Sequence, residues 1–315
     1  MGLLIHFAFA LGLIILIVTA GLVRSLQRPR RKTYGVAVAR GLATDPADLE
    51  LDAVEATFRL TDGADTPGWV ITGGDADGPA VILVHGFHDS KYGALTWAPL
   101  FVPFTSRIVV FDLSGQGEST SPNAHHGIRE ADDILAVMNQ LEYPGPVVLF
   151  GYSFGASTAI AAAARDESQR IIGVIADAPY RYWSQPIANT LRKLRMPAQP
   201  FVALAWLWFR LTEPGFRPFD RCGDAAKLRC PLLVLHGTAD DICPYEAGKA
   251  IAEAAPQGSL VTFEGGRHTQ LALQDQTRYR DHLRMFFSAL RNGADSGTIE
   301  RLARELSSGH PKTGE

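Results

Sequence analysis

A serine between two glycines is the residue of this sequence whose setting most clearly predicts chemistry. Residues 151–155 read Gly-Tyr-Ser-Phe-Gly, directly after the apolar run 147–150 and before the alanine-rich run 156–164. The first run predicts a buried strand and the second predicts a helix. At a sharp strand-to-helix turn the backbone is strained and neighbouring chains come close, so that glycine fits best beside the serine. We therefore predict that Ser153 is a nucleophile raised above a sheet.

A serine hydroxyl is a weak nucleophile at neutral pH and needs a base. We predict that His268 is this base, because it lies in the loop between the last apolar run and the last helical pattern. His85 and His236 also follow apolar runs, but each precedes a glycine, which favours a structural or anion-binding role. The adjacent His125 and His126 lie in a loop before a helical pattern, where we expect exposure to solvent.

An acid should hold the base in the correct tautomer and stabilise its protonated form. Asp240 follows the apolar run 232–235 and lies four residues before Pro244, and we favour it for this role. Its neighbour Asp241 stays an alternative, and Asp177, at the end of the preceding apolar run, is a more remote one. With Asp240, the order along the chain is serine, aspartate, histidine.

Negative charge that develops on a substrate oxygen needs two backbone N–H donors. One should be the amide of Phe154, which follows the nucleophile at the start of a helix. We expect the other to be the amide of Phe87, in the loop His-Gly-Phe-His that follows the apolar run 80–84. These two donors and the three side chains predict a site that cleaves an acyl bond.

Short apolar runs that alternate with helical patterns must position these residues. We predict strands at 54–60, 68–72, 80–84, 107–111, 147–150, 171–176, 232–235 and 260–263, and helices at 128–141, 156–165, 245–255 and 270–290. The first two strands should form a hairpin. Uninterrupted apolar strands are typical of a mostly parallel α/β sheet with helices on both faces. Ligands bind such sheets at the carboxyl ends of the strands, where the candidate residues lie.

The interval of about 181–228 interrupts this alternation. It contains five prolines and the dense apolar run 201–209. We predict an inserted helical lid in which this run forms the buried face. The alternative is that the run binds an acyl chain or dips into a membrane beside Arg192, Lys193 and Arg195.

The first residues predict a transmembrane helix. Within residues 2–23, only His6 and Thr19 are appreciably polar, and a helix of this length is roughly 33 Å long, enough to cross the hydrocarbon core. Positive charges follow in a connector at 24–50, before the first acid at Asp45. Because cationic flanks stay on the cytoplasmic side, we predict a single-pass anchor in the cell membrane, with the N-terminus outside and the catalytic domain cytoplasmic.

A cleaved signal peptide is the competing interpretation of this segment. Val18-Thr19-Ala20 has the small residues of a cleavage site. However, a signal peptide carries positive charge before its apolar run, and that run is shorter. Here the first charged side chain is Arg24, after the apolar run, so we favour the anchor.

Composition predicts one large globular domain behind the anchor. The 315 residues are 46% hydrophobic and 20% charged, and we assign 51–292 to the α/β domain and 293–315 to a tail with a short amphipathic helix candidate at 298–306. The net charge of -3 offers no basic surplus for nucleic acid. The three cysteines lack the spacing of a disulfide scaffold or a zinc knuckle, and we expect no metal site.

Five segments resemble the α/β-hydrolase superfamily in order and spacing. They are residues 85–90, 112–119, 151–155, 236–244 and 265–268. The resemblance covers about residues 54–290 and is nearest to the bacterial branch of serine aminopeptidase-like and prolyl-oligopeptidase-like hydrolases. It implies an eight-stranded sheet, no cofactor, and hydrolysis of esters, thioesters or amides through an acyl-enzyme. Two departures bear on substrate choice: Ser114 stands where many relatives have arginine, and His88 where many have a small residue.

We therefore expect a carboxylester-type serine hydrolase that acts on a small or acyl-containing substrate. A peptidase or an acyltransferase with the same triad is one alternative, and a catalytically silent scaffold is another. The presence of nucleophile, base and acid disfavours the scaffold. Hydrolases with an aspartate nucleophile, such as epoxide hydrolases and haloalkane dehalogenases, are disfavoured by the serine at 153. Lid loops decide substrate identity, which the sequence does not name.

Overall fold

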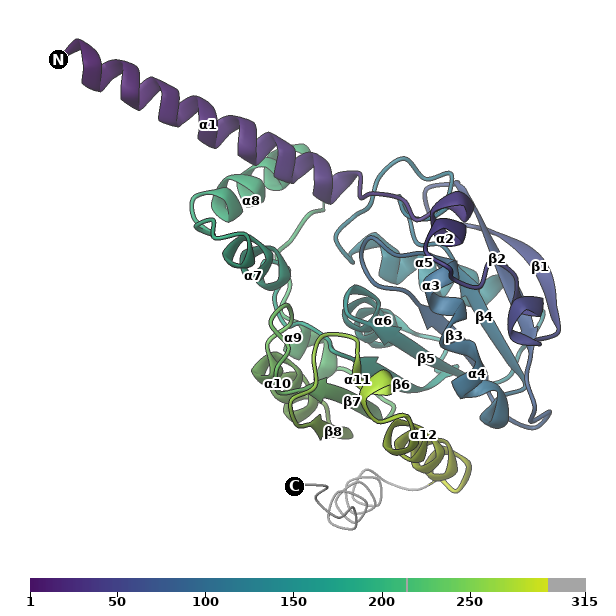
Figure 1. The fold of residues 1–315 in the computed structure, drawn as a ribbon. Coiled ribbons are helices and arrows are strands. Elements are labelled where there is room, and N and C mark those ends of the chain that lie inside the picture. Colours follow the sequence, from purple (N-terminus) through teal and green to yellow (C-terminus); the bar gives the residue numbers. More distant parts are fainter. Residues whose placement is uncertain (214, 294–315) are drawn as a thin grey trace.

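A mixed eight-stranded sheet forms the centre of the protein, and one long N-terminal helix projects from the domain (Figure 1). The computed structural model describes residues 1–213 and 215–293, and the helix candidate at 298–306 lies outside them. The strands are β1 (Ala53–Arg59), β2 (Asp65–Thr72), β3 (Ala80–Val84), β4 (Arg107–Phe111), β5 (Val147–Tyr152), β6 (Ile171–Asp177), β7 (Leu232–Gly237) and β8 (Gly258–Phe263).

The sheet has the order β1-β2-β4-β3-β5-β6-β7-β8. Strands β1 and β2 form the predicted hairpin and pair antiparallel, as do β2 and β4, whereas all other neighbours are parallel. The predicted α/β fold with a mostly parallel eight-stranded sheet is confirmed, and β3 and β4 match their predicted ranges residue for residue. Every residue of β3, β5 and β7 is buried, because helices cover both faces there.

Two hydrophobic clusters lie on opposite faces of the sheet. One face is covered by α5 (Arg129–Gln140), α6 (Phe154–Arg165), α9 (Arg221–Ala225) and α10 (Tyr245–Ala254), and the other by α3 (Lys91–Leu95), α4 (Ala98–Phe101), α11 (Leu271–Gln274) and α12 (Gln276–Arg291). The single helix predicted at 270–290 is thus two helices. The side chain of Asp275 interrupts it by accepting a hydrogen bond from the Arg278 amide (2.9 Å), which caps α12.

The connector after the first helix is folded onto the domain. Helix α1 (Gly2–Gln27) runs past the predicted end of the apolar segment, and two short helices, α2 (Tyr34–Ala39) and the 3-10 helix η1 (Pro46–Leu49), follow it. Arg31 donates to the carbonyls of Ser119 and Ser121, and Lys32 forms an ion pair with Asp89 at 2.5 Å. Two basic residues of the connector, Arg31 and Lys32, are therefore tied to the domain.

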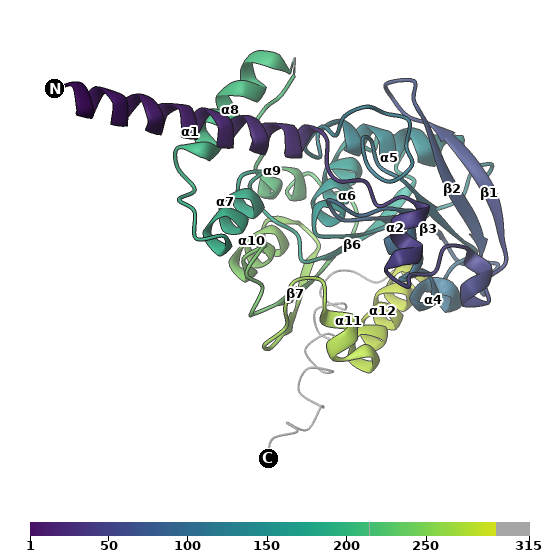
Figure 2. The ribbon, with the colours of Figure 1, turned by 45° about the horizontal axis from the view of Figure 1, so that its top comes forward.

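Two helices interrupt the alternation of strand and helix, as predicted for the 181–228 interval. They are α7 (Gln185–Lys193) and α8 (Phe201–Thr212), which we call the helical insertion. In Figures 1 and 2 the insertion lies beside the C-terminal half of α1. Together they enclose a small hydrophobic cluster, whose buried members are Val23, Trp183, Leu191, Phe201, Val202, Ala205, Phe209 and Phe216.

Candidate active site

The turn between β5 and α6 holds Ser153 in a conformation that few non-glycine residues adopt. Its φ is 56° and its ψ is -116°. The backbone of this turn is tightly packed, because a Cβ on Gly151 would lie 2.3 Å from the Gly155 carbonyl oxygen, and one on Gly155 would lie 2.1 Å from that of Val84. The Ser153 amide donates to the Asp177 carbonyl at 2.8 Å, which fixes the turn to the end of β6. The two glycines are therefore required by the space around this turn.

Three side chains from distant parts of the chain form one hydrogen-bonded row. Nε2 of His268 lies 2.9 Å from Oγ of Ser153, and Nδ1 of His268 lies 2.7 Å from Oδ2 of Asp240. The loops after β5, β7 and β8 supply these residues, and parallel pairing brings the carboxyl ends of those strands to one edge of the sheet. This arrangement allows a proton to pass from the hydroxyl to the imidazole while the carboxylate holds the ring.

The environment of Asp240 keeps its carboxylate ionised. Its side chain is 1% exposed, and Oδ1 accepts hydrogen bonds from the amides of Ile242 (2.9 Å) and Cys243 (2.8 Å). Burial by itself would raise the pKa of Asp240, but hydrogen bonds from His236, His268 and the Cys243 amide outweigh burial and hold the pKa well below its usual range. An ionised carboxylate here stabilises a protonated His268.

The two other aspartates considered for this role face elsewhere. The Asp241 side chain is 62% exposed and pairs with Lys193 at 2.8 Å. Asp177 is buried and accepts a hydrogen bond from the Tyr279 hydroxyl at 2.9 Å. Burial raises the pKa of Asp177 to about 7. Of the three aspartates, the structure places only Asp240 against His268 within the described residues.

Two of the remaining histidines tie loops together. His85 is fully buried, and its ring lies 2.8 Å from the Gly86 carbonyl and accepts from the Leu113 amide at 3.0 Å. His236 is also fully buried, with Nε2 2.9 Å from the Cys243 carbonyl, which shapes the loop that carries Asp240.

The expectation that His126 is exposed is wrong. It is buried, its ring packs on Phe209 at 4.1 Å between centroids, and Nε2 lies 3.5 Å from a Glu213 carboxylate oxygen. The helical insertion folds over this loop and removes it from solvent, which a local sequence pattern does not reveal. His125 is half-buried.

The residues of the two predicted amide donors both lie at the cavity that Ser153 borders. The rings of Phe87 and Phe154 are 5.4 Å apart, and both residues line the same cavity as Ser153. Phe154 is the first residue of α6, where a helix has no acceptor of its own for the N–H. Within the described residues, the Phe87 amide donates to no backbone carbonyl in the loops and turns.

An apolar cavity of about 410 Å³ opens beside the Ser153 hydroxyl. Its walls come from residues 85–88, which we call the oxyanion loop after its predicted role, from the helical insertion and from the first helix. They include Phe87, Phe154, Tyr180, Trp183, Leu191, Leu194 and Met196, with Val18, Leu22 and Leu26 from α1. Sequence analysis did not identify α1 as part of this site, since an apolar segment carries no signal that tells which residues will contact another helix. The cavity suits an aliphatic or aromatic group next to the nucleophile.

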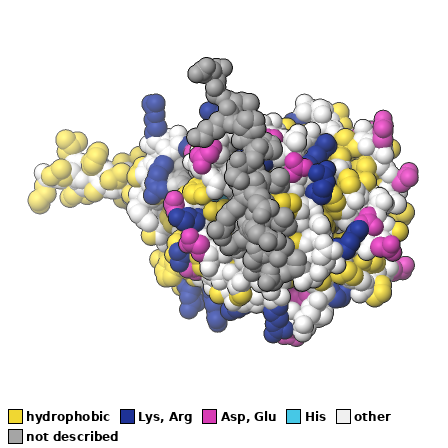
Figure 3. Space-filling model, turned by 90° about the horizontal axis from the view of Figure 1, so that it is seen from below, with side chains coloured by type: hydrophobic (Ala, Val, Ile, Leu, Met, Phe, Trp, Pro, Cys, Tyr) yellow, Lys and Arg dark blue, Asp and Glu magenta, His cyan; other side chains and the backbone are white. Residues whose placement is uncertain are grey.

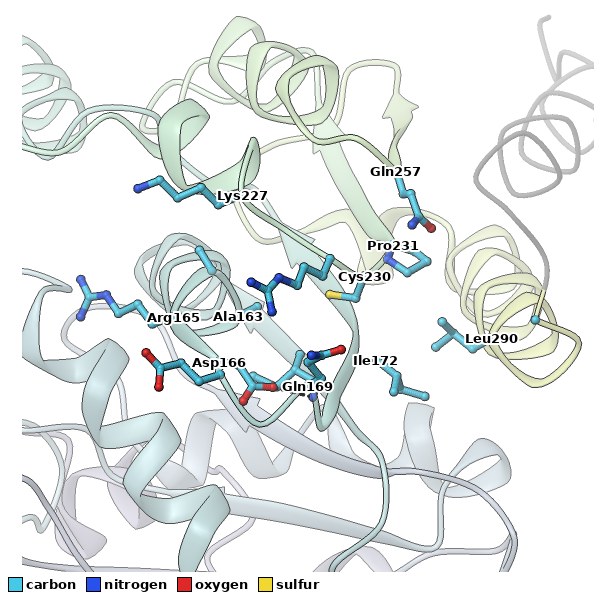
Figure 4. Close-up of a pocket in the computed structure, with 15 residues that line it drawn as sticks. Ala163, Arg165, Asp166, Gln169, Ile172, Lys227, Cys230, Pro231, Gln257 and Leu290 are labelled. Carbon is cyan, nitrogen blue, oxygen red and sulfur yellow. Dashed lines mark hydrogen bonds between the residues drawn. The ribbon is translucent and has the colours of Figure 1, made fainter.

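A larger cavity of about 830 Å³ lies at the opposite edge of the sheet (Figure 4). It is lined where strands begin, by residues such as Ile171, Cys230, Pro231 and Gln257, and none of the three residues of the hydrogen-bonded row borders it. Ligands of α/β sheets bind at the carboxyl ends of the strands. We therefore place the candidate site at the smaller cavity.

The two departures from the superfamily pattern have different surroundings. His88 lines the small cavity, and its Nδ1 accepts from the Arg30 amide at 3.1 Å, which joins the oxyanion loop to the connector. Ser114 is buried and donates to Asp133 away from that cavity. Only His88 is therefore placed to contact substrate directly.

The described residues hold no group of three or more histidine, cysteine or acidic side chains that could bind a metal ion. The carboxylate of Asp112 is instead taken up by the amides of Lys91 (2.6 Å) and Glu118 (2.9 Å). Cys243 is buried close to Ser153, and burial raises the pKa of its thiol well above the usual value, so it stays protonated. Of these two side chains, the Ser153 hydroxyl is the one hydrogen-bonded to His268.

Comparison with known proteins identifies the family from sequence, and solved structures share the fold. A family model described as "Alpha/beta hydrolase family" matches residues 81–281. A bifunctional esterase/perhydrolase of Acinetobacter calcoaceticus is 25% identical over 255 residues, which cover 67% of this chain and 92% of that protein.

Solved structures of similar fold include an esterase of Pyrococcus furiosus, with a TM-score of 0.64 and 19% identity over 78% of this chain and 93% of that one. A membrane phospholipase A described as a bacterial virulence factor has a TM-score of 0.60 and 20% identity, and the match covers 92% of this chain and 98% of that one. Neither comparison selects one branch of the family.

Proposed function

The chain belongs to the alpha/beta hydrolase family, and from this premise we propose that it is a carboxylester hydrolase that works through Ser153, His268 and Asp240. The observation that carries the proposal is the row of hydrogen bonds from Oγ of Ser153 through His268 to Asp240, at 2.9 and 2.7 Å, on a strained strand-to-helix turn. The likeness to the Acinetobacter esterase supports the same reaction class.

The proposed reaction has two halves. His268 takes the proton of Ser153 as Oγ attacks the carbonyl carbon of the ester, and the amides of Phe87 and Phe154 stabilise the oxyanion. Collapse of this intermediate breaks the ester C–O bond, and the protonated His268 gives its proton to the departing alcohol. Water, activated by the same His268, then attacks the acyl-enzyme, releases a carboxylic acid and restores the serine.

The cavity supports an acyl ester as substrate in preference to a peptide. Its lining is mostly apolar, and the polar side chains that border it besides Ser153 are few: Ser25, His88, His126 and Thr190, with the hydroxyl of Tyr180. A peptide would need partners for its backbone N–H and C=O groups, whereas a hydrocarbon chain needs none. A peptidase or acyltransferase with the same triad is the second candidate.

Labelling with a fluorophosphonate probe tests the catalytic proposal. The folded protein should be labelled, and Ser153→Ala should lose the label while keeping its circular dichroism spectrum. Hydrolysis of p-nitrophenyl esters beside aminoacyl p-nitroanilides then separates an esterase from a peptidase. Folded wild-type protein that takes up no probe and cleaves neither substrate would instead be the catalytically silent scaffold.

We also propose that α1 is a membrane anchor, with the N-terminus outside and the catalytic domain in the cytoplasm, and that the helical insertion acts as the lid. Within the described residues, α1 is the one helix long and apolar enough to span a membrane, with a mean hydropathy of 2.7. The basic residues that follow it support this orientation. Intact protein in the membrane fraction, degraded by protease only after the cytoplasmic side is opened, is the expected result; soluble protein with a cleaved N-terminus would contradict it.

A further inference from the structure

The outer face of helix α8 is apolar and exposed. Its inner face is buried against the small cluster described above, yet the outer face carries Leu204, Trp206, Leu207, Trp208 and Leu211, which are 36%, 38%, 45%, 50% and 76% exposed. Exposed apolar side chains gathered on one helix mark a surface that contacts something other than water. The position of α8 beside α1 indicates what that is (Figure 2).

Helices α1 and α8 form one packed unit. Ile15, Val18, Leu22, Val23 and Leu26 of α1 belong to the hydrophobic cluster that α8 helps to build. Near its end, Gln27 donates to a Glu213 carboxylate oxygen just after α8, at 2.9 Å. Any depth at which α1 lies in a bilayer therefore sets the depth of α8 as well.

The length of α1 outside this contact is too short to cross a bilayer. The free segment, residues 2–14, precedes the first contact at Ile15, and its 13 residues (2 to 14 inclusive) span roughly 20 Å at about 1.5 Å per residue. The hydrocarbon core is about 30 Å thick. Figure 3 shows this segment as a rod covered with hydrophobic side chains that projects from the domain. A helix that spans the core must therefore bring its α8-packed turns, and α8 itself, about 10 Å into the apolar layer.

Charged and aromatic residues mark where the membrane surface would lie. Arg24 and Arg28 follow the apolar part of α1 and line a groove of about 360 Å³ together with Ala20 of α1 and Trp208 of α8. Arginine and tryptophan are both favoured at the boundary between hydrocarbon and headgroups. This boundary places the outer face of α8 in contact with acyl chains.

The cavity beside Ser153 lies on the other side of the same helix pair. Val18, Leu22 and Leu26 of α1 form part of its wall, next to Leu194 of the helical insertion. A chain that leaves the bilayer along α1 thus reaches Ser153 through a mostly apolar surface.

We propose that α8 is immersed in the membrane and that α1 forms one wall of the acyl site, so that the substrate is a lipid ester whose acyl chain enters sideways from the bilayer. This substrate class rests on the proposed carboxylester hydrolysis, whereas the immersion of α8 does not. Cleavage of α1 near Ala20 would remove Val18 from the wall and leave the cavity open on that side.

Quenching of tryptophan fluorescence tests the immersion. Full-length protein is placed in vesicles whose lipids are brominated either near the headgroup end or near the methyl end of the acyl chains. The chain has five tryptophans, so the double variant Trp206→Phe/Trp208→Phe serves as reference for the other three. We expect stronger quenching by the shallow bromines, and we expect the double variant to lose most of it. Equal quenching of wild type and double variant would overturn the immersion of α8.

The selectivity of the enzyme for acyl-chain length tests whether α1 forms a wall of the acyl site. Leu22→Trp should fill part of the cavity and lower the ratio of kcat/KM for a long-chain p-nitrophenyl ester to that for the butyrate by about tenfold, the effect of roughly two excluded methylene groups. Ile17→Trp, on the exposed side of the same helix, is the matched control and should change neither rate. Equal loss on both esters, or equal effects of the two variants, would refute α1 as the acyl wall.

The proposed ester hydrolysis and the proposed entry of lipid from the bilayer can be refuted separately. If wild-type protein hydrolyses no ester and takes up no fluorophosphonate, the proposed function is wrong, and the quenching result still reports on α8. If wild type hydrolyses p-nitrophenyl butyrate but Leu22→Trp leaves long-chain hydrolysis intact, the esterase stands and the lipid-entry route is wrong.

Discussion

Oδ2 of Asp240 lies 2.7 Å from Nδ1 of His268, while the carboxylate of the next residue, Asp241, points to Lys193 at 2.8 Å. Two adjacent acids thus have opposite surroundings, one with a 1% exposed side chain and the other with a 62% exposed one. This difference in burial agrees with the preference for Asp240 over Asp241 in the sequence analysis.

Replacing these acids one at a time should give unequal effects. Asp240→Asn keeps the shape of the side chain but removes the charge that stabilises the His268 imidazolium and fixes its tautomer. We expect kcat for a p-nitrophenyl ester to fall by about 10³–10⁴. Asp241→Asn is the matched control and should leave kcat within about twofold, as for a surface ion pair. The reverse order of effects would make Asp241 the acid.

The amide of Phe87 can be tested by comparing two substitutions. Phe87→Ala removes the ring and keeps the N–H, whereas Phe87→Pro also removes the N–H. If this amide stabilises the oxyanion, the proline variant should lose a further factor of about 10²–10³ in kcat relative to the alanine variant. Thermal melts show whether both variants are folded, and equal turnover of two folded variants would rule out this donor.

The spacing around the serine turn predicts a steric cost at Gly155. A Cβ there would lie 2.1 Å from the Val84 carbonyl oxygen, whereas one on Gly223 meets nothing within 4 Å. Gly155→Ala should lower the free energy of unfolding by about 1–3 kcal/mol and misplace Ser153. Gly223→Ala, on α9, should be neutral or stabilising by up to about 1 kcal/mol. Denaturant unfolding measures both, and similar values for the two would contradict the packing at the turn.

Buried acids predict that stability decreases as pH rises. Burial raises the pKa of Asp177 to about 7, so the folded protein holds this proton where the unfolded chain, with a pKa near 4, has lost it. The folded state therefore binds more protons between about pH 4 and 7, and its stability falls across that window. Asp112 and Glu130, with pKa values raised by burial to about 7, act in the same direction.

The variant Asp177→Asn isolates the contribution of Asp177 to this pH dependence of stability. The amide resembles the protonated acid and still accepts a hydrogen bond from the Tyr279 hydroxyl. The variant should lose less stability than wild type between pH 5 and 8 when Tm is measured across that range, while the exposed Asp241→Asn should follow wild type. An unchanged slope in Asp177→Asn would mean that Asp177 is ionised in the folded state throughout.

Sequence analysis predicted the central strands well because they have a continuous apolar pattern. Buried parallel strands such as β3 need every side chain to be apolar, so their bounds can be read directly. The short helices α3 and α4 were not predicted, because elements of four or five residues do not complete enough turns to show a period. The break between α11 and α12 depends on one capping side chain, that of Asp275, within an otherwise helical pattern.

The sequence by itself determined the sheet, the strand-to-helix turn at Ser153 and the short set of candidates for base and acid. These depend on local periodicity, on the space that glycine leaves and on which residues follow each strand. The tertiary structure set Asp240, which the sequence already favoured, apart from Asp241. It alone buried His126 and placed α1 against the cavity. Those outcomes depend on contacts between segments far apart in the chain. The direction of a side chain and the packing of one helix on another decide which residues come together, and a local sequence pattern contains no information about either.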